Sequence, residues 1–571
     1  MLFWGDILEK RQNVKLIKLG FVFLVIVILI ICRLLFLIVV KGDDYIALAQ
    51  STRLKTIEVN QFERGTILDC NGRPLTNIEE NCLVVFPRLV SDYKWLENVL
   101  LANLNGDEKT ITSDWQEKFT ENIPYIVQRN LSDYEVEQYN KMIEGNGLTG
   151  VFVLTLEMRY EIDNLASHTI GFVGEPDKNA IKELEKLGFG SNTYIGKSGI
   201  EFQYNEWLIG DDSDDIGVVA DEKSIQIDNQ LRLIEGEKIE GYGNDVELTI
   251  NKDYQEFLET AMVGKSGGAV LMNVENGDIM AIASTPNYNQ YEGQSSTEGS
   301  DYINKAFAYY PPASVFKTVL VLAALENDIE FNNNFFCNGK ITLFGGHTVS
   351  CWEENGHGLE NLSMALSNSC NPYFVDLGQK IGGKTIMDFA YNLGLGEQKV
   401  IGYNVISMED NIMYNPGALA DVANVSIGEN GVRLSPLLVA QLMSTIANGG
   451  NTITPRLVKG VKSEAGEYLK EFLSAEPRRV VSEENCKILR NYLKTAVTNG
   501  TGSPVSSSIV EIAGKTGTSQ DAGVWFAGFM PVDEPKYAIA VYIENGTSGG
   551  SDAGTVAKAV FEKIATVEGL T

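Results

Sequence analysis

The longest uninterrupted apolar stretch of the chain runs from Leu19 to Val40 and contains one charge, Arg33. Its length matches the ~20 residues that a helix needs to span a bilayer, and an arginine near one end of a span can extend to the interface. The residues before the stretch are rich in cations: Lys10, Arg11, Lys15 and Lys18. Since cations favour the cytoplasmic side, we expect a single-pass cell-membrane protein. It would have a cytoplasmic tail over 1–18, a transmembrane helix over 19–40 and an extracytoplasmic remainder.

A cleaved signal peptide is the alternative for this segment. No A-x-A-like site directly follows the run, which is also long for a signal peptide. Beyond it, residues 41–245 alternate short strand-like runs, such as LKTIEVNQF and CLVVFPRLV, with polar turns and charged helical segments. This pattern predicts an elongated, mixed α/β pedestal domain.

From residue 246 the pattern changes. A strand and an amphipathic helix precede a hairpin, GGAVLMNVENGDIMAIAST, and a long helical region. Three strand-like runs follow, IVEIAGKTGTSQ, VWFAGFMP and KYAIAVYIENG, and then a last helix, AGTVAKAVFEKIATV. This order predicts an α+β domain over 246–571, in which an antiparallel sheet carries helices on both faces beside an all-helical part.

Composition narrows the function. A chain of 571 residues predicts two or three domains. The formal net charge of −30 argues against a nucleic-acid partner, because phosphate binding needs clustered cations. The seven cysteines are too sparse for a disulfide scaffold: Cys32, Cys70, Cys82, Cys337, Cys351, Cys370 and Cys486.

The first candidate for chemistry is Ser314, in YYPPASVFKTVLVLAALEN. Prolines are tolerated at the start of a helix, so we expect Ser314 near a helix N-terminus, where the helix dipole favours negative charge. Lys317 lies one turn later on the same face, and its apolar neighbours lower its pKa. A neutral amine beside a serine hydroxyl can act as a general base. By itself this spacing is a weak signal, because a capping serine and a surface lysine produce it too.

Two further motifs follow in order. Ser369 and Asn371 flank Cys370, and their hydroxyl and amide can relay a proton and hold a peptide carbonyl. Lys515, Thr516, Gly517 and Thr518 lie in a predicted strand. There the lysine and first threonine would receive a carboxylate, while the glycine would let a substrate backbone approach as an added strand. Helix capping and an ordinary turn are the alternatives when each motif is taken alone.

Together the three motifs are those of penicillin-binding proteins and class A β-lactamases. The chain resembles the class B penicillin-binding proteins over nearly its whole length. RGTILDCNGRPL from Arg64, HTIGFVGE around His168 and GKSGIEFQYNEWLIG from Gly196 resemble pedestal motifs of that family. SIGENGVRLSPLLVAQLMSTIANGG and WFAGFMP resemble its transpeptidase half. Ala313 stands where a glycine is usual and Cys70 where arginine is frequent.

The resemblance implies a peptidoglycan D,D-transpeptidase. Ser314 would attack the penultimate D-Ala carbonyl of a stem peptide, with Lys317 as the base, and an amine of a neighbouring stem peptide would take the acyl group. Ser369 and Asn371 would assist proton transfer, and the backbone N–H groups of Ser314 and Thr518 would form the oxyanion hole. Acyl transfer needs no cofactor, and β-lactams would acylate the same serine.

The alternatives within this superfamily are a D,D-carboxypeptidase and a membrane-bound β-lactam sensor. A sensor would need a cytoplasmic signalling portion, and only about 18 residues are predicted inside. A β-lactamase would need neither an anchor nor the pedestal. The run CWEENGHGLENLSMALSNSCNPYF resembles the elongation type of class B protein. The resemblance therefore implies a membrane glycosyltransferase and cell-wall elongation proteins as partners.

A cysteine cluster precedes the second motif. Cys337, Cys351, His357 and Cys370 form a Cys₃His set of the kind that binds structural zinc. Some elongation-type relatives resemble the chain in carrying metal-binding side chains at matching places. A Cys337–Cys351 disulfide and free thiols are the alternatives, and His347 is a weaker candidate ligand. Zinc here would support the loop that carries Ser369.

Overall fold

The computed structural model describes strand 54–57 and residues 64–570. The gaps in that range are 105–117, 121–123, 191–192, 211–214, 221–225, 235–241, 292–301, 406–416 and 520–522. Of the predicted membrane segment 19–40, only Leu24 and Arg33 are described. Among the helices of the described residues, none is long and apolar enough to cross a membrane. The predicted span and cytoplasmic tail otherwise lie outside the described residues.

The chain divides into two compact units. The first comprises residues 1–61, 81–156 and 213–236, and the second comprises 62–80, 157–212 and 237–571. The second unit therefore takes in residues 62–80, 157–212 and 237–245 of the predicted pedestal as well as the C-terminal half. One reason is a parallel pairing of β2 (Ile67–Leu68) with β10 (Asp245–Leu248). The expected domain boundary at 245–246 stays a prediction.

The first unit is mixed α/β. Its sheet has the order β4-β3-β5, with bounds Tyr125–Gln128, Ile78–Val85 and Val151–Met158. Helices α3 (Tyr93–Asn103) and α5 (Asp133–Asn146) contribute to its core, in which Leu83, Leu100 and Tyr139 are buried together. A capping box between Ser132 and Glu135 starts α5. A separate antiparallel sheet joins β1 (Leu54–Ile57), β8 (Asp215–Ala220) and β9 (Gln226–Ile234).

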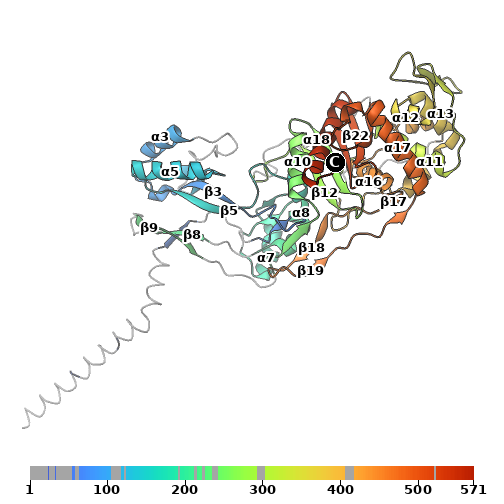
Figure 1. The fold of residues 1–571 in the computed structure, drawn as a ribbon. Helices are drawn as coiled ribbons and strands as arrows, with labels where there is room; N and C mark the ends of the chain where they lie inside the picture. Colours follow the sequence, from blue (N-terminus) through green and yellow to red (C-terminus); the bar gives the residue numbers. More distant parts are fainter. Residues whose placement is uncertain are drawn as a thin grey trace, which may run out of the picture. The chain divides into compact units, whose positions relative to one another are not determined.

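The second unit is built on a five-stranded antiparallel sheet of order β12-β11-β23-β22-β21 (Figure 1). The strand bounds are Ile279–Thr285, Gly267–Asn273, Tyr537–Ile543, Gly523–Met530 and Ala513–Ser519. Nearly every residue of these strands is buried, and β11, β12, β22 and β23 are mostly apolar in sequence because both of their faces are covered. Strand β21, which carries the third motif, is an edge strand.

Helices cover both faces of this sheet, as predicted. Val270 and Met272 of β11 pack in one core with α16 (Pro436–Ala447). Ala269 and Leu271 pack in a second core with α10 (Lys252–Met262) and α18 (Gly554–Glu568). Because successive side chains of a strand point to opposite faces, the two cores lie on opposite sides of the sheet. The α+β class is thereby confirmed for this unit.

The helical part lies between β12 and the last strands. Its helices are α11 (Lys317–Glu326), α12 (Leu362–Ser367), α13 (Asn371–Ile381), α14 (Gly383–Asn392), α15 (Leu419–Ser426) and α17 (Glu483–Asn499). An all-helical part was predicted, and that prediction is wrong, because this part also contains strands. Between α11 and α12 lie four short strands: β13 (Phe335–Cys337), β14 (Lys340–Thr342), β15 (Thr348–Ser350) and β16 (Gly358–Glu360). Left-handed glycines at 345 and 346 turn β14 into β15, and such turns favour a hairpin over a helix.

Candidate active site

The first motif forms the turn that enters α11. Ser314 lies in a 3₁₀ turn, Ala313–Phe316, which runs directly into α11 after two prolines. Its side chain is partly exposed, and Ser314 Oγ makes no hydrogen bond to another described residue. The predicted position at a helix N-terminus is therefore correct, and the hydroxyl is open to a substrate.

The turn before Ser314 is held in a costly conformation. Ala313 has φ +47°, a region that costs a residue with a Cβ about 1–2 kcal/mol. Its N–H donates to Gly428 O at 2.9 Å, and a Cβ at Gly428 would lie 1.9 Å from Ala313 O. Trp525 Nε1 donates to Pro311 O at 2.9 Å from the sheet. These contacts hold the backbone of Ala313 in its left-handed conformation.

Lys317 is fully buried and links the first motif to the second. Its Nζ donates to Ser369 O at 2.9 Å, Asn371 Oδ1 at 2.7 Å and Ser369 Oγ at 3.4 Å. Burial lowers the Lys317 pKa to about 8, although nearby acidic groups act in the opposite direction. A substantial share of this amine is therefore neutral near physiological pH, as the apolar neighbours in the sequence predicted.

Lys515 links the third motif to the same serine. Its Nζ donates to Ser369 Oγ at 3.0 Å and to Thr516 O at 2.9 Å. The side chain is fully buried, and burial together with the charge of Lys317 holds its pKa well below the ordinary value. Two lysines thus converge on Ser369, which itself has φ +58°. Because the Lys515 amine is buried, its predicted effect on a substrate carboxylate would have to come from its electrostatic field inside the site.

Strand β21 borders the site with its free edge. Thr518 is exposed and Thr516 is 7% exposed, so the two hydroxyls differ in access. At Gly517 an added Cβ would lie 3.1 Å from Pro312 O and 3.3 Å from Val315 Cγ2. The glycine therefore allows β21 to pack against the turn of Ser314, a reason that differs from the substrate approach inferred from the sequence.

Thr501 is a residue that the sequence analysis missed. Its Oγ1 lies 2.7 Å from Thr516 Oγ1, so a third hydroxyl joins those of the third motif. The preceding Gly500 packs so closely on the helix before Ser369 that a Cβ would lie 2.3 Å from Ser367 O. A glycine–threonine–glycine turn directly after a long helix was the available signal.

Glu429 is the second residue that was missed. Its Oε2 accepts from Ser519 Oγ at 3.1 Å, beside the end of the third motif, and its charge also raises the Lys317 pKa. It lies in the turn that holds Ala313, because Gly428 is its neighbour. The carboxylate thus joins β21 to the support of the Ser314 turn.

The predicted cysteine cluster is brought together in the structure. The ligand atoms of Cys337, Cys351, His357 and Cys370 all lie within 4.8 Å of one another. Cys351 Sγ is 3.5 Å from His357 Nδ1, and the zinc–ligand bond lengths would place these two atoms about 3.6 Å apart on a tetrahedron. A hydrogen bond from Cys370 lowers the Cys351 pKa, which favours a thiolate. The donor set therefore fits a tetrahedral zinc.

Cys370 connects this cluster to the site, since it lies between Ser369 and Asn371. The six described cysteines are all free, so the alternative Cys337–Cys351 disulfide is not formed. His357 and not His347 belongs to the cluster. Zinc binding itself stays a prediction.

Comparison with known proteins identifies the two halves of the chain. Residues 267–566 match the family model of the penicillin binding protein transpeptidase domain, and residues 60–248 match the penicillin-binding protein dimerisation domain. The first match covers more than half of the chain. The pairing of a dimerisation domain with a transpeptidase domain is the class B arrangement that the motifs predicted.

Curated relatives and a solved structure resemble the chain. The stage V sporulation protein D of Bacillus subtilis is 27% identical over 95% of this chain and 83% of its own length. The peptidoglycan D,D-transpeptidase MrdA of Acinetobacter baumannii is 25% identical over 97% of this chain and 89% of its own. Penicillin-binding protein A of M. tuberculosis, solved as an imipenem acyl-enzyme, has 27% identity and a TM-score of 0.53 over 56% of this chain and 80% of that one.

The similarity to MrdA proteins agrees with the elongation type, which the run CWEENGHGLENLSMALSNSCNPYF indicated. The geometry around Ser314 and both family models lead to the same conclusion: the chain belongs to the penicillin-binding proteins, as a class B member.

Proposed function

We propose that the protein is a serine-type peptidoglycan D,D-transpeptidase that acts in cell-wall synthesis and is a target of β-lactams. The observation that carries this proposal is the environment of Lys317. A buried amine with a pKa of about 8 lies three residues from the partly exposed Ser314 and is hydrogen-bonded to both polar residues of the second motif. Such an amine can accept the proton of the attacking hydroxyl.

The reaction follows in two steps. Ser314 Oγ forms a bond to the carbonyl carbon of the penultimate D-Ala, and its proton passes to Lys317 and then to the terminal D-Ala, which leaves. An amine of a second stem peptide then attacks the ester, and its proton restores the Ser314 hydroxyl. The free edge of β21 offers N–H and C=O groups to an extended peptide. The N–H groups of Ser314 and Thr518 would stabilise the oxyanion.

Covalent labelling with a fluorescent penicillin tests this proposal. We expect the wild type to be labelled and Ser314→Ala to be unlabelled while its thermal unfolding is unchanged. Lys317→Ala should lower the acylation rate by about 10²–10⁴-fold, because the general base is lost. Incubation with pentapeptide substrates should yield a cross-linked dimer, whereas release of D-Ala alone would indicate a carboxypeptidase. Labelling that persists in Ser314→Ala would exclude this serine as the nucleophile.

We also propose that the protein is membrane-anchored through residues 19–40 and works in elongation with a membrane glycosyltransferase. The apolar run, the preceding cations and the similarity to MrdA proteins support this. External protease on spheroplasts should digest nearly the whole chain, and protection of 246–571 would contradict the topology. Co-purification from membranes with a polymerase would identify the partner. Because the chain is also similar to a sporulation protein, recovery of that complex from sporulating cells instead of growing cells is the competing outcome.

The Cys₃His cluster supports a structural zinc as part of the same proposal. Cys337, Cys351, His357 and Cys370 would hold it, and it would fix the loop of Ser369 without entering the reaction. Elemental analysis should find about one zinc per chain. Cys370→Ser should lose the metal and part of its acylation rate, whereas a metal-free, fully active wild type would exclude the site.

A further inference from the structure

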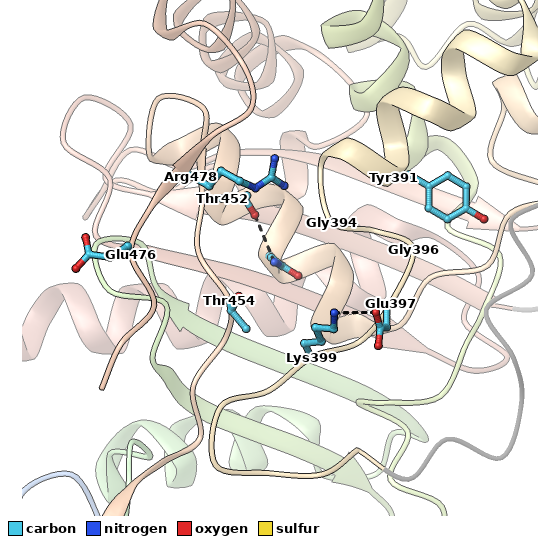
Figure 2. Close-up of a pocket in the computed structure, with 10 residues that line it drawn as sticks. Tyr391, Gly394, Gly396, Glu397, Lys399, Thr452, Thr454, Glu476 and Arg478 are labelled. Carbon is cyan, nitrogen blue, oxygen red and sulfur yellow. Dashed lines mark hydrogen bonds and ion pairs between the residues drawn. The ribbon is translucent and has the colours of Figure 1, made fainter. Parts of the chain in front are cut away.

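A hollow lies in the second unit, and it is formed by residues outside the three motifs. Its volume is about 520 Å³, within the range of small-molecule sites. Its walls come from the segment after α14, from α16 and from the strands β17 (Asn451–Thr452) and β20 (Arg478–Arg479) with their flanks (Figure 2). None of the described residues that line it belongs to one of the three motifs.

Glycines keep this hollow open. Gly394 has φ +89°, and an added Cβ would point toward Gln441 Nε2 at 3.5 Å and Thr452 Oγ1 at 3.9 Å. At Gly396 a Cβ would lie 2.2 Å from Tyr391 Cδ1, so the tyrosine ring rests directly against the backbone there. That ring is 50% exposed. The hollow thus combines a polar floor with a half-exposed aromatic ring, and Figure 2 shows the ring at the opposite side from Thr452.

The floor has hydrogen-bonding capacity to spare. Gln441 Nε2 makes two long bonds, to Thr452 Oγ1 at 3.4 Å and to Ile453 O at 3.3 Å. The Gln441 side-chain carbonyl and the Thr454 hydroxyl make no hydrogen bond to another described residue. An amide and two hydroxyls offer both donors and acceptors to a ligand. This suits a molecule whose own groups are hydroxyls and amides.

The rim is balanced in charge. Arg478 is the cross-strand partner of Thr452, and its guanidinium is held by Asn392 O at 2.8 Å. Lys399 forms an ion pair with Glu397 at 2.9 Å, and Glu476 adds a second carboxylate (Figure 2). Two cations and two carboxylates do not favour a polyanion. A neutral ligand, or one with a single carboxylate for Arg478, fits better.

We propose that this hollow binds the glycan backbone of uncross-linked peptidoglycan, a polymer of N-acetylated hexosamines. Its hydroxyl and acetamido groups match Gln441, Thr452 and Thr454, and the apolar face of a sugar ring can pack on Tyr391. This inference rests on the proposed function, because that function supplies the polymer. A strand held here raises the local concentration of its stem peptides at the enzyme.

Ligand-observed NMR titration of the full-length protein in detergent tests this inference. The probe is a peptide-free tetrasaccharide of alternating N-acetylglucosamine and N-acetylmuramic acid. We expect saturable binding by the wild type. Thr454→Val should weaken it about three- to tenfold and Tyr391→Ala about tenfold, the effects of one lost hydrogen bond and one lost ring contact. Tyr134→Ala is the matched control, because that tyrosine is also exposed, at 70%, but lies in the other unit.

Penicillin acylation separates this inference from the proposed function. Tyr391→Ala and Thr454→Val should acylate at the wild-type rate, since neither residue touches the motifs. Normal acylation without glycan binding, or glycan binding that is equal in all variants, would overturn the glycan site alone. Preferential binding of a glycerol phosphate oligomer would overturn the ligand class. Absent acylation in the wild type would overturn the proposed function, and the glycan site with it.

Discussion

Lys317 shows how one residue can be buried and still chemically useful. Its amine is surrounded by protein, with the Phe374 ring centroid 5.3 Å away, yet each of its N–H groups finds an oxygen of the second motif. Burial disfavours the ammonium, and nearby acidic groups, among them Cys370 of the second motif, oppose this effect and leave the pKa at about 8. The second motif therefore serves to orient and tune the base as well as to contact substrate.

This pKa predicts the pH dependence of acylation. The neutral amine is the active form, so the acylation rate should rise with pH through about 8 and level off above it. About a tenth of the amine is neutral at pH 7 and about nine-tenths at pH 9, which gives an increase of about tenfold. The second-order rate constant with a fluorescent penicillin between pH 6 and 9.5 measures it. A flat profile, or one that falls in this window, would mean that another group takes the proton.

At the scale of elements, the site depends on how closely β21 packs against the turn of Ser314. Gly517 is the contact point, because an added Cβ would be tighter than ordinary contact with Pro312 O, Val315 and Trp525 Cβ. The backbone of the turn cannot yield without moving the nucleophile, since Trp525 and Gly428 hold it from two sides. The spacing of these two elements is thus part of the catalytic geometry.

We therefore expect Gly517→Ala to impair chemistry more than stability. A displacement of a few tenths of an ångström in β21 or the turn should lower the acylation rate by at least about tenfold, while the free energy of unfolding falls by about 1 kcal/mol. Gly417→Ala is the control, because no atom of the described part of the chain lies within 4 Å of its Cβ position. Acylation of Gly517→Ala at the rate of this control would show that the packing is not critical.

At the scale of the whole molecule, a buried ion cluster ties distant parts of the sequence into the second unit. Glu201 accepts from Arg64 Nε at 2.6 Å and lies 2.7 Å from Arg159 Nη2, and all three side chains are buried. Burial by itself would raise the Glu201 pKa, but Arg159 and Arg64 hold it below its ordinary value. Tyr160 Oη donates to Glu201, and Arg64 Nη2 donates to Asn205 Oδ1. The cluster joins the pedestal segments 62–80 and 157–212 to each other within this unit.

Removing the charge of Glu201 should therefore destabilise the second unit strongly. Glu201→Gln leaves two guanidinium groups buried without a counter-charge, a change that costs about 3–5 kcal/mol. Chemical denaturation with tryptophan fluorescence measures the loss. Glu137→Gln is the comparison, since the Glu137–Lys141 pair is exposed and should contribute nothing measurable. Equal midpoints for the two variants would refute the importance of the cluster.

Much of this protein could be predicted from local pattern alone. Three features depend on residues within a few positions of one another. They are the order of the strands around the third motif, the helix start at Ser314 and the direction of the Lys317 pKa shift. Periodicity, proline placement and apolar neighbours report such short-range physics directly. The proximity of Cys337, Cys351, His357 and Cys370 was also predicted, because three cysteines and a histidine suggest a zinc site before any distance is known.

Only the tertiary structure decided what meets across long separations. The contact of Thr501 with Thr516, the burial of Lys515 on Ser369 and the dependence of Gly517 on Pro312 join segments that no periodicity connects. The assignment of residues 62–80 and 157–212 to the second unit is of the same kind. A sequence pattern records which face of an element is apolar, but the free energy of packing selects which other element covers that face. The partners of each catalytic residue are set at that later step.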